Sequence, residues 1–254
     1  MTTLIYDSTF EGLLTAVFEV FEYKYDVVEI VAQQNYSQEN FFAETHEVIT
    51  NFTKSDRVLK KLEENFGKEG ISQLMMVYFS ERKDLERLIL SAVWHSIKHP
   101  KQNILQDFGN EDILEISKIC RSVSRERHRM LAFVRFELLQ DEVYFAKIEP
   151  DFNVLPLIRK HFKERYADQK WMIFDLKRHY GIFYDLKEVH FFTPDSSQLQ
   201  NFRNSEQFHH EEEKKYQKLW QRYFVKTGIP ERKNMKLHIQ WVPKRYWKYL
   251  TEKY

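Results

Sequence analysis

Apolar side chains near the start of the chain follow a strand pattern and then a helix pattern. Residues 3–7 predict a short strand, and Ser8-Thr9-Phe10-Glu11 predicts a capping box, in which Ser8 and Glu11 satisfy free amide groups of a helix. Residues 27–31 and 47–50 each suggest a further short strand. The helix presents one apolar face at i, i+3 and i+4 spacing, made of Phe10, Leu13, Leu14, Val17, Phe18 and Phe21.

Helical periodicity continues from residue 55 to residue 128 in four successive apolar stripes. Gly67 is expected to end the first of these helices, and Pro100 the third. The fourth stripe begins at Ile113 and runs into the basic residues 125–129.

The period changes in the second half, where residues 131–139 and 143–149 predict a β-hairpin. A helix is expected from Val154 to Arg165, then strands at 171–175, 182–185 and 189–192. A polar loop over 194–204, a charged helix over 206–226 and a basic, aromatic tail complete the chain.

These elements predict an α+β fold with a mostly helical portion, residues 1–130, and a sheet portion, residues 131–254. The second portion is expected to hold a small antiparallel sheet with one covering helix, followed by the C-terminal helix and tail. Because no linker separates the two portions, we expect them to pack as one compact unit.

Charge is distributed unevenly along the chain although its net value is only +1. Residues 1–120 carry 12 Lys and Arg against 20 Asp and Glu, whereas residues 121–254 carry 27 against 18. The basic second half suggests a polyanionic partner, but attraction between two oppositely charged halves explains the asymmetry equally well.

The composition also excludes several classes of protein. Cys120 is the single cysteine, so an internal disulfide or a cysteine-based zinc site is excluded, and no metal site or cofactor is predicted. Neither a secretory signal nor a membrane span is recognisable, and we expect a cytoplasmic protein. The chain lacks GxxxxGK[ST], GxGxxG and GxSxG, which argues against nucleotide hydrolysis and dinucleotide chemistry.

Four blocks of sequence resemble an uncharacterised bacterial family of probable DNA metabolism proteins. They are residues 6–19 (YDSTFEGLLTAVFE), 124–136 (SRERHRMLAFVRF), 147–178 and 219–247, in the order of the family. Ser8 and Ala132 stand where the family has glycine. The resemblance implies a link to a radical-SAM protein of DNA modification or repair, and to uracil-DNA-glycosylase-like domains that are fused to some relatives. With one cysteine this chain cannot hold the iron–sulfur cluster of a radical-SAM enzyme, so such chemistry would belong to a partner.

Glu126, His128 and Asp175 are the candidate catalytic residues, because a carboxylate and an imidazole can exchange a proton; Arg178 could hold a phosphate or an oxyanion. Glu126 and His128 lie two residues apart and point to opposite sides of a helix. They would face one site only if the helix ended near Arg127.

Cationic and aromatic residues of the second half are the candidates for nucleic-acid contact. Arg121, Arg125 and Arg129 follow i, i+4, i+8 spacing, which suits either a phosphate-binding ridge or ion pairs with Glu126 and Glu137. His161 and Arg165 share a helix face, whereas the charged segment 209–213 is expected to be solvated. The full set is Arg121, Arg125, Arg129, Arg135, His161, Arg165, Arg178, Arg232, Lys236, Trp241, Lys244, Arg245, Trp247 and Lys248.

Three functions are compatible with these features. The first is a DNA-binding accessory protein of a repair or modification system, working with a radical-SAM partner. The second is a glycosylase-like enzyme that processes a base extruded from DNA, and the third is a protein-interaction scaffold.

Overall fold

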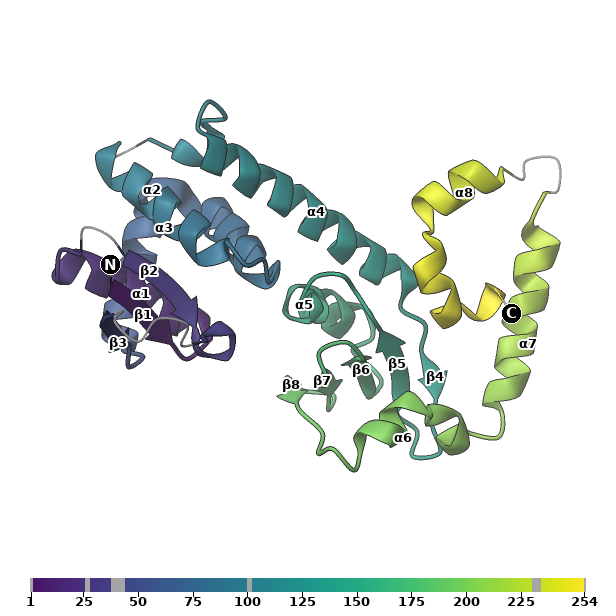
Figure 1. The fold of residues 1–254 in the computed structure, drawn as a ribbon. Helices are drawn as coiled ribbons and strands as arrows, with labels where there is room; N and C mark the ends of the chain where they lie inside the picture. The colour runs from purple at the N-terminus through teal and green to yellow at the C-terminus, as the bar shows by residue number, and fades with distance from the viewer. Residues whose placement is uncertain (1, 26–27, 38–43, 100–101, 230–233, 254) are drawn as a thin grey trace. The chain divides into compact units, whose positions relative to one another are not determined.

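The computed structural model describes residues 2–25, 28–37, 44–99, 102–229 and 234–253. These residues form helices and two small sheets, which confirms the predicted α+β class. The chain divides into two units, residues 1–124 and 125–254, and helix α4 (Glu111–Phe133) contributes turns to both. Figure 1 shows the order of the elements.

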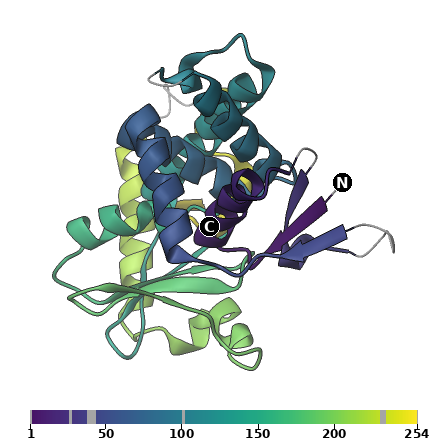
Figure 2. The ribbon, with the colours of Figure 1, turned by 90° about the vertical axis from the view of Figure 1, so that its left-hand side faces the viewer.

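The first unit contains a parallel sheet that the sequence indicated only in part. Strand β1 (Thr2–Tyr6) lies between β2 (Val28–Ala32) and β3 (Glu44–Glu47), and Leu4 is in register with both Ile30 and His46. The third strand thus begins three residues before the predicted range 47–50 and shares only Glu47 with it. Figure 2 shows the three strands side by side, with helix α1 (Phe10–Glu22) next to them. Because β1 and β2 are parallel, the chain must cross over between them, and α1 makes that crossover.

The N-cap of α1 is Thr9, and the predicted capping box at Ser8 is therefore wrong. The Thr9 Oγ1 atom accepts a hydrogen bond from the Gly12 amide at 2.9 Å and donates one to Asp7 Oδ1 at 2.6 Å. Ser8 has a φ of 64° and belongs to the turn that connects β1 to the helix. The helix thus starts one residue later than predicted.

The helices of the first unit follow the predicted apolar stripes. Helix α2 (Phe52–Phe79) is broken at Gly67, whose φ of 67° favours glycine. This break lies at the residue where the sequence predicts that the first helical stripe ends. Helix α3 (Leu85–Lys98) packs against α2, and α2 packs against α1. Their facing residues form the core of this unit, which includes Leu13, Leu14, Val17, Leu62, Leu74, Val77, Leu88, Ile89 and Ala92.

Helix α4 extends to Phe133, so the prediction of a strand over 131–139 is wrong for its first residues. Only β4 (Glu137–Leu138) is a strand there, and it pairs antiparallel with β5 (Tyr144–Ile148). The β-branched and aromatic composition suggested a strand, but Val123 and Met130 extend the buried helical stripe of α4. Burial of that stripe outweighs the local preference for a strand.

The second unit contains a five-stranded sheet in the order β4-β5-β6-β7-β8. Strands β6 (Trp171–Asp175) and β8 (Val189–Phe192) confirm the prediction, and β7 (Tyr180–Tyr184) begins two residues early. The expected all-antiparallel arrangement is wrong for one pair, because β5 and β6 are parallel. Helix α5 (Leu155–Arg165) connects them as a crossover and buries Ile158 and Phe162.

Close packing of neighbouring strands requires a glycine at residue 181. A Cβ atom at Gly181 would lie 2.4 Å from the Phe192 ring and 2.9 Å from the Ile173 carbonyl oxygen. Trp171, Ile173, Phe174 and Ile182 are fully buried in this sheet.

The C-terminal part of the second unit is more helical than predicted. Helix α6 (Leu199–Arg203) and a 3-10 helix (Ser205–Phe208) occupy the end of the expected loop and the start of the expected helix. Helix α7 (Glu213–Thr227) therefore begins seven residues later than predicted. Helix α8 (Met235–Trp241) and two 3-10 helices (Lys244–Tyr249 and Thr251–Lys253) form the tail. None of the helices in the described ranges has the length and apolar character needed to cross a bilayer.

Candidate nucleic-acid interface

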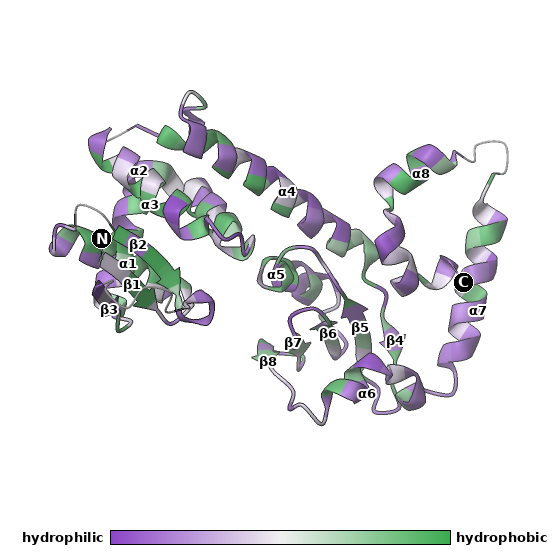
Figure 3. Ribbon diagram, in the orientation of Figure 1, coloured by the Kyte–Doolittle hydropathy of each residue, from purple (hydrophilic) through white to green (hydrophobic). Residues whose placement is uncertain are grey.

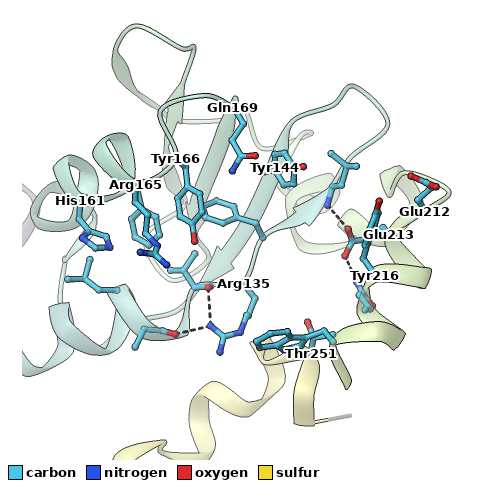
Figure 4. Close-up of a pocket in the computed structure, with 18 of the residues that line it drawn as sticks. Arg135, Tyr144, His161, Arg165, Tyr166, Gln169, Glu212, Glu213, Tyr216 and Thr251 are labelled. Carbon is cyan, nitrogen blue, oxygen red and sulfur yellow. Dashed lines mark hydrogen bonds between the residues drawn. The ribbon is translucent and has the colours of Figure 1, made fainter. Parts of the chain in front are cut away.

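A groove of about 920 Å³ runs across the second unit. The end of α4, the segment around β4, the start of β5, helix α5 and helix α7 line it. It brings together four residues that the sequence selected from separate segments, namely His128, Arg135, His161 and Arg165. Figure 4 shows this groove with its lining side chains.

One end of the groove is cationic. His161 and Arg165 lie one turn apart on α5, and both are exposed, as is His128 on α4. Arg165 has no ion pair with a carboxylate in the described part of the chain, and its guanidinium lies 5.7 Å from the centre of the Tyr166 ring. In Figure 4 the His161 and Arg165 side chains lie next to each other, with Tyr166 beyond them. This end can therefore accept an anion without first breaking an ion pair.

Aromatic side chains follow the cationic end along the groove. Tyr144, Tyr166, Tyr216 and Trp220 all line it, and Tyr216 is 52% exposed. Phe136 supports this wall because its ring meets that of Tyr166 edge-on, at 5.4 Å between centroids. Tyr216 and Trp220 are exposed and Tyr144 and Tyr166 are half-buried, and accessible rings can stack on unpaired bases. The sequence analysis did not select these four residues, although the Tyr216–Trp220 spacing of one helical turn was visible.

The opposite end of the groove contains Glu212 and Glu213. Glu213 is buried and accepts hydrogen bonds from the Leu138 amide at 2.8 Å and from Gln217 Nε2 at 2.9 Å. His209 Nε2 lies 3.1 Å from Glu137 Oε2. The expectation of a solvated face over 209–213 holds for Glu211 and Glu212, which are exposed, but it is wrong for His209 and Glu213, because these two residues connect the start of α7 to β4.

Arg135 forms part of the groove wall by holding the end of the chain. Its guanidinium donates to Glu252 Oε1 at 2.8 Å and to the Ala132 carbonyl at 2.8 Å. Glu252 also accepts from Trp220 Nε1 at 2.9 Å. Burial alone would raise the pKa of Glu252, but the hydrogen bonds from Arg135 and Trp220 hold it below the usual value.

Glu126 is buried and points away from the groove. Its Oε1 atom accepts from the Asp151 amide at 2.9 Å and from the Tyr246 hydroxyl at 2.5 Å, and its Oε2 atom from Arg245 at 2.8 Å. Arg129 lies 3.5 Å from the same carboxylate. Because α4 continues to Phe133, Glu126 and His128 lie on different sides of the helix and do not converge. Of the two alternatives for the arginines of α4, a phosphate-binding ridge or ion pairs, the structure shows an ion pair with buried Glu126 for Arg129.

Asp175 is fully buried beside Arg178. Its Oδ1 atom accepts from the Lys177 and Arg178 amides at 2.9 and 3.1 Å, and its Oδ2 atom accepts from the Arg178 guanidinium at 2.9 Å. Arg178 also donates to the carbonyl groups of Pro150 and Asp151. Burial raises the pKa of Asp175. Asp175 and Arg178 thus hold the Pro150–Asp151 segment, which also contacts Glu126. Neither Asp175 nor Arg178 lines the groove.

The remaining candidates are spread over the surface of the chain. Arg121 and Arg125 are exposed on α4, Lys236 and Trp241 are exposed on α8, and Arg232 lies outside the described residues. A second hollow contains Lys177, Lys244, Arg245 and Lys248, but Glu149 and Asp151 lie between these cations. Lys248 pairs with Glu149, and Arg245 with Asp151. Trp247 is packed, since its Nε1 atom donates to the Val242 carbonyl at 3.0 Å.

A family model described as a domain of unknown function (DUF4130) matches residues 83–252, which include every residue that lines the groove. No curated protein matches the chain.

Proposed function

Since the chain belongs to the family described as a domain of unknown function (DUF4130), we propose from its groove that it is a DNA-binding accessory protein. It would serve a DNA repair or modification system. The observation that carries the proposal is that His128, His161 and Arg165 all line one aromatic groove. These residues come from two helices, and no carboxylate of the described chain pairs with Arg165.

The combination of cations and rings favours a single strand over a duplex. Cations neutralise phosphates and release counterions, whereas stacking on aromatic rings contributes about 1–3 kcal/mol per base and requires bases that are not paired. A phosphate at His161 and Arg165 would place the following bases along Tyr166, Tyr144 and Tyr216. We therefore propose single-stranded or locally unpaired DNA as the ligand.

Radical chemistry would be supplied by a radical-SAM partner, as the family resemblance suggests. The single cysteine supports this division of labour, because Cys120 cannot hold a cluster alone. Burial raises the pKa of Cys120 to about 11, so that it remains a thiol at neutral pH. Its Sγ atom donates to the Gln73 carbonyl at 3.4 Å, which is consistent with a structural role.

A base-processing enzyme is the second candidate, because the groove has room for an unstacked nucleotide and is lined by His128. Glu126 and Asp175 weigh against it, since both are buried and engaged outside the groove. A lesion-containing oligonucleotide that is cleaved by the chain, but not by a His128→Gln variant, would establish the enzyme instead. The scaffold hypothesis stays a prediction.

The test is fluorescence anisotropy of the full chain with a labelled 15-nucleotide oligo-dT and with a 15-base-pair duplex, from about 25 to 300 mM NaCl. We expect the single strand to bind more tightly, with an affinity that falls linearly in log salt. Arg165→Ala should weaken binding about tenfold and reduce the salt slope by about one. Tyr166→Leu should weaken single-strand binding about fivefold to tenfold, with less effect on the duplex.

Lys160→Ala is the matched control, because Lys160 is an exposed cation on the same helix that does not line the groove. It should change the affinity less than twofold. Equal losses in Lys160→Ala and Arg165→Ala would show that only the net charge matters and would contradict the groove. Absence of binding at the lowest salt concentration would contradict DNA binding itself.

A further inference from the structure

Helices α7 and α8 expose an unusual amount of apolar surface. Half of the large hydrophobic side chains that are exposed in the described residues lie between residues 216 and 241. Glu213 is the only buried residue of α7, and α8 has none. Figure 3 shows hydrophobic bands on both helices. Large exposed apolar patches on a folded chain are typical of interaction surfaces.

This surface is hollowed between α8 and the end of α7. The hollow has a volume of about 760 Å³, and its walls include Phe224, Val225, Ile229, Leu237 and Trp241. Three of these five side chains are aliphatic and offer apolar area but no ring for a base to stack on, whereas Phe224 and Trp241 do supply rings. Such a wall fits the apolar stripe of an amphipathic helix better than it fits a nucleic-acid strand.

The helices on either side of the hollow are basic, and Lys253 lies among the described residues that line it. Helix α7 carries Lys214, Lys215, Lys218, Arg222 and Lys226, and its one carboxylate, Glu213, is buried. Arg222, Lys226 and the nearby Lys236 have no ion pair with a carboxylate in the described ranges, and no acidic residue lines the hollow. An occupant with carboxylates beside its apolar stripe would complement these cations.

We propose that this hollow binds an amphipathic helix of a partner protein whose apolar stripe is flanked by Asp and Glu. A second copy of the chain is a poor occupant, because a two-fold contact through this surface would place α7 cations against one another. The sequence assigned Lys236 and Trp241 to nucleic acid, and that ligand is the main competitor. The proposal goes beyond DNA binding in the groove and does not depend on it.

The probe is a labelled, 18-residue helical peptide with Leu and Phe at i, i+3, i+4 and i+7 and with Glu flanking that stripe. A second peptide has Lys in place of every Glu. In anisotropy titrations of the full chain at 150 mM NaCl, we expect the Glu peptide to bind at least tenfold more tightly than the Lys peptide. Binding of neither peptide at 200 µM chain, or equal binding of both, would overturn the proposal.

Two substitutions locate the site. Leu237 is 48% exposed, so Leu237→Glu should not disturb the fold, yet it should weaken binding of the Glu peptide more than tenfold. Lys226→Glu should weaken binding of the Glu peptide about threefold. It should also reduce the ratio between the affinities for the Glu peptide and the Lys peptide. Ile49→Glu is the matched control, since Ile49 is 83% exposed in the first unit, and it should leave peptide binding unchanged.

The Leu237→Glu variant also distinguishes the proposed partner helix from the two other possible occupants, a second copy of the chain and a nucleic acid. Light scattering of the chain at 100 µM is expected to show a monomer; a dimer that Leu237→Glu dissociates would assign the surface to a second copy and overturn the proposal. Oligo-dT that displaces the Glu peptide from the wild-type chain, and that binds Leu237→Glu more than tenfold less tightly, would assign the surface to nucleic acid instead.

Discussion

Two polar regions of the second unit both draw on helix α4, yet they differ in how far their charges are satisfied. Around Pro150 and Asp151, the carboxylates of Glu126 and Asp175 are buried and bound by arginines and backbone amides. In the groove, His161 and Arg165 are exposed, and no carboxylate of the described chain pairs with Arg165. Two residues along α4 separate the regions, since Glu126 belongs to the first and His128 to the second.

This difference teaches which polar residues are available for a ligand. A buried charge is costly unless it is paired, so the partners of Glu126 and Asp175 are required by the fold. An exposed cation needs no partner for folding, and its position beside aromatic rings is therefore informative about binding. The candidate catalytic carboxylates thus belong to the structure, whereas the groove carries the proposed function.

The largest effect is expected from Glu126→Ala. Removal of this carboxylate leaves the Tyr246 hydroxyl and the Asp151 amide without their acceptor and takes from Arg245 one of its two carboxylate partners, at a cost of about 3 kcal/mol. Urea unfolding followed by circular dichroism measures the loss. A variant of unchanged stability that has lost DNA binding or activity would place Glu126 in the functional site and break the comparison.

Asp175→Asn should have a smaller effect in the same direction. It removes the charge that faces Arg178 but keeps an oxygen for the two amides, and we expect a loss of about 2 kcal/mol. Because burial raises the pKa of Asp175, the variant recovers part of the desolvation cost. The same urea titration tests this. A loss larger than that of Glu126→Ala would show that the clamp on the 150–151 segment depends mainly on Arg178.

Acid should loosen the groove wall at Glu252. Its pKa in the folded chain is below the ordinary 4.5, so the ionised carboxylate stabilises the fold above about pH 4.5. That contribution is lost as the pH falls through the folded pKa. We expect the indole N–H signal of Trp220 in nitrogen–proton NMR spectra to shift below pH 4.5. In Glu252→Gln that titration should be absent, and an identical titration in both chains would contradict the assignment.

The smallest effect on stability is expected from Arg165→Ala. Surface substitutions without partners change the free energy of unfolding by about 0.5 kcal/mol or less, although this variant should lose DNA affinity. Lys160→Ala is again the control, measured by the same urea titration. A loss above about 1 kcal/mol in Arg165→Ala would mean that Arg165 has a structural partner, and the contrast between the two regions would weaken.

Much of the local structure could be predicted because periodicity is a local property of the chain. Strand β6, helix α5 and the break at Gly67 follow from spacing and residue type. The end of α4 could not be predicted in this way, since residues 131–133 have strand-like composition but continue the helix whose buried stripe includes Val123 and Met130. The parallel pairing of β5 with β6 likewise depends on where α5 packs.

The basic residues of the candidate site were predicted from the sequence, and its aromatic residues were missed. His128, His161, Arg135 and Arg165 were selected, whereas Tyr144, Tyr166, Tyr216 and Trp220 were not. Basic residues in the basic half can be identified individually from the sequence. Aromatic residues are equally common in cores, and only their exposure in the folded chain separates the two roles.

The sequence by itself determined the α+β class, most helices and strands, and the basic character of the second half. The tertiary structure alone decided which charges are satisfied. Glu126 and Arg245, for example, are 119 residues apart and meet at 2.8 Å. The physical reason is that amphipathic spacing acts within a few turns or strands, whereas the pairing of a buried charge depends on contacts between distant segments, which no local pattern records.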